Sequence, residues 1–216
     1  MDSCCRHDDC CAPARQAAEP HYRRVLWAVL VINAAMFAVE IGAGVLAGSA
    51  SLQADALDFM GDAANYGISL FVVGMALRYR ALAAFAKGTS MGLFGIWVLG
   101  AAAWHAWHGT LPHAFTMGAV GFSALAANAA SFGLLWRFRG GDANMRSAWI
   151  CTRNDVLGNL AVLLAALGVF GTGTGWPDIV VAAVMATLAL QGAWIVLQQS
   201  LAELQQSRPV VQLAGE

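Results

Sequence analysis

The fold is decided by residues 51–77, SLQADALDFMGDAANYGISLFVVGMAL. This stretch is long enough to cross a bilayer as one helix, because about 20 predominantly apolar residues span the hydrocarbon core. Asp55, Asp58 and Asp62 interrupt it at spacings of three and four, which place them on one helix face. An ionisable group near the bilayer centre costs roughly 2.5 to 3.5 kcal/mol, so it is usually retained for ions, protons or a counter-charge. We therefore interpret the segment as a transmembrane helix that lines a cation site.

The composition of the whole chain agrees with a membrane protein. Of 216 residues, 59% are apolar and 12% charged, and the mean hydropathy is +0.60, which excludes a soluble domain. The apolar segments show no alternation of period two, which argues against a membrane β-barrel. We expect an all-α membrane protein with six transmembrane helices. Windows of spanning length occur at 25–47, 51–77, 82–107, 111–136, 148–170 and 179–199.

The basic residues predict the orientation. Apart from Arg153, the basic residues precede the first span or follow the second, fourth and sixth, with Lys87 near the edge of the third: Arg6, Arg15, Arg23, Arg24, Arg78, Arg80, Lys87, Arg137, Arg139, Arg146 and Arg208. Segregation of Lys and Arg to one side places both termini in the cytoplasm. We expect a cytoplasmic tail and linker at 1–22, a six-helix cation efflux domain at 23–204, and a short cytoplasmic tail at 205–216.

The amino-terminal tail is rich in metal-binding side chains. These are Cys4, Cys5, His7, Cys10 and Cys11. Cytoplasmic thiols stay reduced, so metal capture is favoured over a disulfide framework. The alternative is a leader whose thiols have no specific role, because adjacent cysteines do not match a C-x-x-C knuckle.

Polar residues also interrupt the fifth span. Cys151 and Asp155 stand four residues apart there, with Asn154 between them. If their helix face meets Asp58 and Asp62, three carboxylates and one thiolate converge from two helices. Two such pairs on facing helices are a natural four-ligand geometry for a divalent transition ion.

Two motifs resemble those of the cation diffusion facilitator family, six-helix exporters of divalent metals. Residues 47–62, AGSASLQADALDFMGD, are similar to the second-helix signature, in which His or Asp precedes Asp by four. Residues 144–159, NMRSAWICTRNDVLGN, are similar to the fifth-helix signature, in which His precedes Asp by four. The resemblance implies Asp58, Asp62 and Asp155 as metal ligands, with Cys151 standing where His is expected. Glu40 and Asp178 resemble recurrent acidic positions in the first and sixth helices.

The chain departs from the family at its carboxyl end. Members usually continue after the sixth helix into a cytoplasmic ferredoxin-like domain that binds metal and supports dimerisation. Here few residues follow the sixth span, so we expect a truncated form and a homodimer formed through transmembrane helices. The loop 78–90 contains no His, Asp or Glu for the family's accessory loop site.

The chemistry of the predicted ligands suggests exchange of metal for protons. Carboxylates and thiolates bind a metal only when deprotonated, so metal and protons compete for one site. No G-x-x-x-x-G-K-[ST] sequence occurs, and a proton gradient is the expected energy source. Zinc is the first expected cargo, with cadmium and cobalt next. If Asn154 or water completes the shell instead of Cys151, iron(II), manganese or nickel becomes the alternative.

Two other classes of function are alternatives to transport. Intramembrane aspartyl proteases carry Y-D and G-x-G-D, which are missing from this sequence, so we expect no enzyme. A non-transporting metal sensor or accessory subunit is the remaining alternative. Asp55 and Glu40, and Asn154 on the fifth span, are candidate gate or accessory residues. We expect an inner-membrane protein whose partners are lipid, divalent metal ions and protons, without resident cofactor or nucleic acid.

Overall fold

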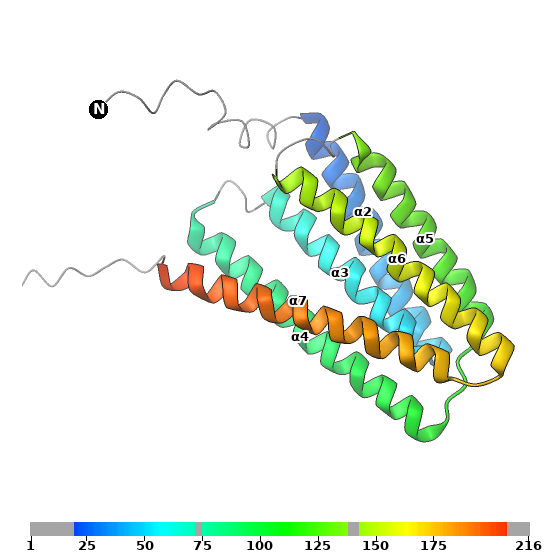
Figure 1. The fold of residues 1–216 in the computed structure, drawn as a ribbon. Helices are drawn as coiled ribbons and strands as arrows, with labels where there is room; N and C mark the ends of the chain where they lie inside the picture. Colours follow the sequence, from blue (N-terminus) through cyan, green and yellow to red (C-terminus); the bar gives the residue numbers. More distant parts are fainter. Residues whose placement is uncertain (1–19, 72–74, 138–142, 207–216) are drawn as a thin grey trace, which may run out of the picture.

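The described residues of the computed structural model form six α-helices (Figure 1). The structure describes residues 20–71, 75–137 and 143–206, with side chains except those of residues 77, 143–154 and 206. The helices are α2 (Pro20–Ala47), α3 (Ala50–Phe71), α4 (Leu77–His108), α5 (Ala114–Trp136), α6 (Ala143–Thr172) and α7 (Trp176–Gln206). The prediction of six helices is confirmed.

Short turns at one end of the bundle make consecutive helices antiparallel. Gly48, Gly109 and Gly173 each adopt φ of 63°, a left-handed conformation that glycine reaches without a Cβ penalty. The imidazole of His113 caps α5 by accepting from the backbone N–H of Thr116. The helices therefore run up and down, and the chain enters α2 and leaves α7 at the same end (Figure 1).

Two predicted span boundaries are wrong. The second span was expected to reach Leu77, but α3 ends at Phe71 and Leu77 begins α4. The apolar run continues across this connection, so hydropathy alone does not mark where one helix stops. The beginning of α5 at Ala114 also falls later than the predicted 111, after Pro112 and His113.

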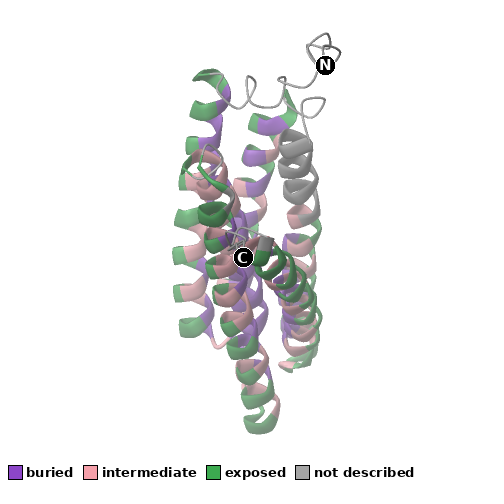
Figure 2. Ribbon diagram, turned by 90° about the vertical axis from the view of Figure 1, so that its left-hand side faces the viewer, coloured by how far each residue is buried: buried purple, intermediate pink, exposed green. Residues whose placement is uncertain are grey.

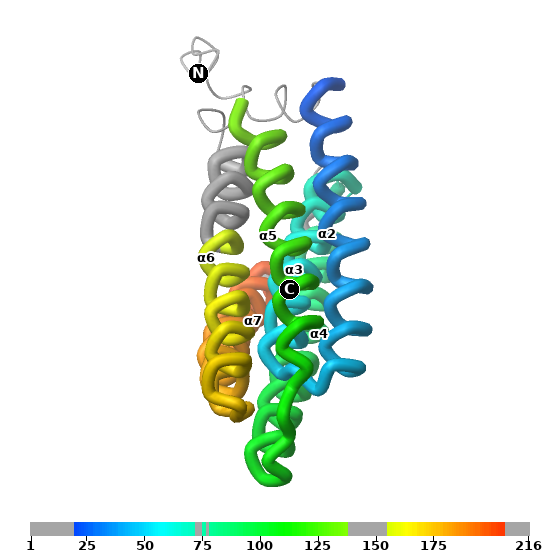
Figure 3. The backbone as a smooth tube through the Cα atoms, turned by 90° about the vertical axis from the view of Figure 1, so that its right-hand side faces the viewer, coloured from blue at the N-terminus to red at the C-terminus, as the bar shows by residue number. Residues whose placement is uncertain are grey.

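The helices pack as pairs around a central α3. The pairs α2–α3, α5–α6 and α4–α7 lie side by side, and α3 also touches α4, α6 and α7. A tube view shows α2, α5 and α6 as neighbouring columns (Figure 3). In α4, Cβ atoms at Gly88 and Gly95 would lie 3.0 Å from Leu197 and Leu190 of α7. Small residues of this kind let membrane helices approach closely.

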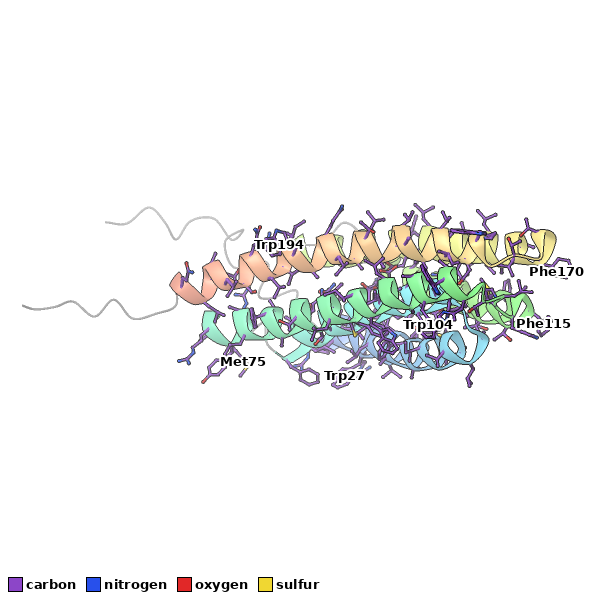
Figure 4. All side chains as sticks on the ribbon, turned by 90° about the horizontal axis from the view of Figure 1, so that it is seen from below. Trp27, Met75, Trp104, Phe115, Phe170 and Trp194 are labelled. Atoms are coloured by element: carbon purple, nitrogen blue, oxygen red, sulfur yellow. The ribbon has the colours of Figure 1, made fainter. Side chains whose placement is uncertain are left out.

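The outer surface is apolar and the interior is polar in places, the reverse of a water-soluble domain. All six helices carry exposed large apolar side chains, and Figure 4 labels six such residues of the chain: Trp27, Met75, Trp104, Phe115, Phe170 and Trp194. Figure 2 shows the buried residues gathered between the helices. An apolar surface of this extent is compatible with lipid and not with water.

Five of the six helices are long and apolar enough to cross a membrane, and the exception is α3. That helix carries Asp55, Asp58 and Asp62. Every residue from Ala50 to Leu57 is buried, because the neighbouring helices enclose this half of α3 on all sides. A helix shielded from lipid by protein can carry charges that a lipid-facing helix cannot.

Candidate metal centre

The three aspartates of α3 occupy its interior face, as their spacing predicts. Asp55 is 1% exposed, Asp62 is 6% exposed, and Asp58 between them is half-buried. The phenol of Tyr66 donates to Asp62 Oδ2 at 3.1 Å. Asp62 is therefore anchored within its own helix, whereas no described residue donates a hydrogen bond to Asp55 Oδ2.

The acidic face of α3 meets α6. A Cβ atom at Gly158 of α6 would lie 3.5 Å from Asp58 Oδ2 and 3.7 Å from Asp55 Oδ1. One turn earlier on α6, the carboxyl group of Asp155 lies close to that of Asp62. The predicted juxtaposition of these two helices at their carboxylates is thus present in the structure.

Substitution of Gly158 tests this contact. Its Cβ position has ordinary van der Waals room against Met185 and Asp58, so Gly158→Ala is expected to keep metal transport near the wild-type rate. Gly158→Leu would overlap the Asp58 carboxylate, an overpacking that costs about 1 to 3 kcal/mol and moves a predicted ligand. We expect metal transport in vesicles to fall at least several-fold. Gly67→Leu is the matched control, because nothing lies within 4 Å of its Cβ position. Equal transport by the two Leu variants would contradict the contact.

A fourth carboxylate faces the aspartates from α2. Glu40 is fully buried and lies next to Asp55. Neither of its oxygens has a hydrogen-bond partner among the described residues. Four acidic side chains of α2 and α3 and a fifth of α6 therefore share one buried region.

A lysine approaches from the opposite direction along α3. The Lys87 ammonium on α4 donates to Asn65 Oδ1, one turn of α3 beyond Asp62 toward the end that holds the chain termini. Its positive charge acts on the Asp62 carboxylate. The sequence interpretation placed Lys87 only near a span edge, and no local pattern signals its contact with α3.

The buried atoms without partners share a chemical character. Apart from His105 Nδ1, all of those in the described part of the chain are side-chain oxygens of α2, α3, α5 or α6: Glu40 Oε1 and Oε2, Asp55 Oδ2, Asn128 Oδ1, Ser131 Oγ, Asp155 Oδ2 and Asn159 Oδ1. A buried polar atom without a partner costs about 1 to 3 kcal/mol, so native proteins rarely contain many. Cations, protons or water molecules in the interior of the bundle would provide partners for these oxygen atoms.

Several predicted site residues lie outside the described part. The side chains of Cys151 and Asn154 are not described, although the backbone places Cys151 on α6 one turn before Asp155. The tail residues Cys4, Cys5, His7, Cys10 and Cys11 are also outside it. Among the side chains that are described, no three of His, Cys, Asp or Glu form a group that could hold a metal ion. The complete ligand set therefore stays a prediction.

The acidic residue of the sixth helix has a different partner from the other carboxylates. Asp178, fully buried in the first turn of α7, accepts from Ser49 Oγ at 2.7 Å and from the backbone N–H of Ala50 at 2.8 Å. It also accepts from the N–H and the hydroxyl of Ser51, at 3.1 and 2.6 Å. Asp178 thus caps the amino terminus of α3 from another helix. Sequence reasoning missed this role, since Ser49 by itself is an ordinary helix-cap residue.

A comparison with protein families agrees with this architecture. The family model described as the cation efflux transmembrane domain matches residues 26–205. The chain belongs to this family. The resemblance predicted from the two motifs is confirmed, and the match includes most or all of each of the six helices. With five candidate spans, family membership identifies a multi-pass inner-membrane protein.

Curated relatives of the chain are bacterial metal transporters by name. It is 29% identical over 201 residues to the zinc transporter ZitB of Escherichia coli strain K12, covering 87% of this chain and 64% of the relative. It is 25% identical over 198 residues to the metal cation efflux system protein CzcD of Cupriavidus metallidurans, covering 86% and 63%. A cadmium, cobalt and zinc/H(+)-K(+) antiporter of Bacillus velezensis is 24% identical over 204 residues, covering 87% and 64%. The chain thus spans less than two thirds of the length of these relatives.

Proposed function

We propose that the chain exports divalent transition-metal cations from the cytoplasm across the inner membrane in exchange for protons. Zinc is the first expected cargo, followed by cadmium and cobalt, and the metal is a transported substrate rather than a resident cofactor. The observation that carries the proposal is the convergence of buried carboxylates from α3 and α6. The names of the relatives, a zinc transporter and a cadmium, cobalt and zinc antiporter, support the choice of metals.

The proposed cycle uses the competition between metal and protons for the same oxygens. Metal from the cytoplasm displaces protons from Asp58, Asp62 and Asp155, and the helices then rearrange to expose the site to the outside. External protons displace the metal, and the protonated site returns. Alternating access around a site near the membrane midplane is the general logic of secondary transporters.

Lys87 has a specific part in this cycle. Its ammonium lies close enough to Asp62 for their charges to attract, on the side of the chain termini. A fixed positive charge there neutralises part of the acidic cluster and raises the electrostatic cost of a second cation entering behind the first. We propose that Lys87 limits how tightly the dication is held, so that protons can displace it.

Reconstituted vesicles test the function directly. The purified full chain in proteoliposomes with an imposed pH gradient is expected to move zinc into the acidic interior and to stop when a protonophore collapses the gradient. Metal movement that ignores the gradient would remove proton coupling from the proposal. A chain that binds zinc but moves none would favour the accessory-subunit alternative.

Cys151 is expected to set metal preference, because one thiolate shifts a carboxylate site toward softer ions. Cys151→Ala should lower the ratio of cadmium to manganese transport. Cys151→His should raise the ratio of zinc to cadmium transport. Competition assays in the same vesicles measure both ratios. If neither substitution changes selectivity or rate, Cys151 is not a ligand. Asn154 or water would then complete the metal shell, and iron(II), manganese or nickel would become the expected cargo.

Two further proposals concern parts of the protein that the site does not include. We expect a homodimer formed through membrane helices, and metal capture by the tail cysteines within 1–22. Deletion of residues 1–11 should reduce metal tolerance of expressing cells at low expression levels. Unchanged tolerance and transport would count against the tail.

A further inference from the structure

Glu40 and Asp55 form a pair that the proposed central site does not use. Glu40 is 0% exposed on α2, and Asp55 is 1% exposed on α3. Their carboxyl groups lie next to each other. Both oxygens of Glu40 and Oδ2 of Asp55 have no hydrogen-bond partner within the described residues. Three carboxylate oxygens in one buried place therefore lack a donor.

The pair lies on the outer side of the central carboxylates. Glu40 and Asp55 stand eight residues before and seven residues after Gly48, which turns the chain between α2 and α3 away from the termini. Asp58 follows Asp55 by three residues, or roughly 4.5 Å along a helix axis. A dication that leaves Asp58 toward the outside reaches Glu40 and Asp55 next.

The surroundings of the pair offer negative charge rather than positive. Asp58 faces it from the same helix, and Asp155 of α6 acts on Asp55 as well. Lys87, by contrast, is engaged with Asn65 beyond the far side of Asp62. Two buried carboxylates without a donor need a cation or protons, since an unpaired buried charge is strongly disfavoured.

We propose that Glu40 and Asp55 form a second, outer position for the divalent cation, to which the central site hands its metal during release. The inference rests on the proposed function. Its chemical basis is that adjacent carboxylates can replace leaving ligands one at a time, so the metal need not regain its whole hydration shell in a single step. Oxygen ligands without a thiolate also hold a transition ion more loosely than the predicted central set.

Counting bound metal tests the second position. The purified full chain is equilibrated with radioactive zinc at concentrations rising well above saturation of the central site. Glu40→Gln is expected to bind one zinc per chain fewer than wild type, while its tightest binding remains unchanged. Any metal held by the tail cysteines cancels in this difference. Glu203→Gln makes the same chemical change near the carboxyl-terminal end of α7, and this variant is expected to bind as much zinc as wild type does.

The transport assay provides the second readout. In vesicles, Glu40→Gln should lower the maximal rate of zinc transport by about 10-fold, which is the lower end of the effect of losing a supporting group around a metal. The half-saturating zinc concentration on the loading side should stay unchanged. Glu40→Asp should recover part of the rate, and Asp55→Asn should lose the same single zinc. Thermal unfolding identifies any variant that fails to fold, in which case Glu40→Asp and Asp55→Asn decide.

The outcomes separate this inference from the function on which it rests. Equal zinc counts for wild type, Glu40→Gln and Asp55→Asn would overturn the second position and leave a carboxyl pair that holds only protons. Failure of wild type to move zinc would instead overturn the proposed function. A lost zinc together with an unchanged transport rate would overturn the release role.

Discussion

Asp62→Asn and Asp155→Asn are each expected to reduce zinc transport by more than about 100-fold. Loss of a residue that only supports a metal ligand already costs roughly 10- to 100-fold, and loss of a ligand itself should cost more. Each substitution keeps the size of the side chain and removes one negative charge where α3 and α6 face each other. A neutral amide is a far weaker ligand for a divalent ion than a carboxylate. Initial rates of zinc uptake into proteoliposomes measure the effect.

The control for these variants separates ligand loss from misfolding. Glu203→Gln removes a charge near the end of α7, outside the carboxylate cluster, and should transport as wild type does. The Asn variants should also unfold no more easily than wild type, because each removes a buried negative charge from a group of like charges. A variant with full stability and full transport would show that its carboxylate is not a ligand.

Asp178→Ala is expected to lower the free energy of unfolding by about 3 kcal/mol or more, because each hydrogen bond to a charged group contributes about 1.5 to 3 kcal/mol. Four donors at the start of α3 lose their acceptor: two hydroxyls, from Ser49 and Ser51, and two backbone N–H groups, of Ala50 and Ser51. The amino terminus of α3 is buried there, so water cannot replace the carboxylate fully. Thermal and denaturant unfolding of the purified chain in detergent measure the loss.

The conservative variant separates the contribution of charge from that of hydrogen bonding. Asp178→Asn retains one acceptor oxygen and should lose about half as much stability as Asp178→Ala. If both variants unfold at the wild-type temperature, the cap seen between α7 and α3 makes no net contribution. If both fold well yet fail to transport, Asp178 acts on the metal rather than on helix packing.

The sequence predicted the helices and the acidic face because both are local properties. Hydropathy over about 20 residues finds a spanning helix, and the spacing of Asp55, Asp58 and Asp62 fixes their common face whatever surrounds them. The boundary near Leu77 was wrong because the apolar run continues past the end of α3. The meeting of Asp62 with Asp155 was predicted from the chemistry a metal requires.

The remaining parts of the site depend on contacts between distant segments. Ser49 and Asp178 are 129 residues apart, and nothing near either residue indicates the other. The contact between Lys87 and Asn65 likewise depends on how α4 packs against α3. The closeness of Glu40 to Asp55 follows from the tight α2–α3 pairing, where a Cβ at Gly44 would lie 2.9 Å from Gln53 Cγ. Such proximity needs the three-dimensional fold.

Anomalous X-ray scattering from crystals of the full chain grown with zinc tests the central claim most directly. The predicted result is a strong zinc peak between α3 and α6, within about 2.0 to 2.2 Å of carboxylate oxygens of Asp58, Asp62 and Asp155. A second, weaker peak at Glu40 and Asp55 would accompany it at high zinc concentration. A zinc peak elsewhere in the bundle, with the α3 and α6 carboxylates turned toward separate cavities, would contradict the account.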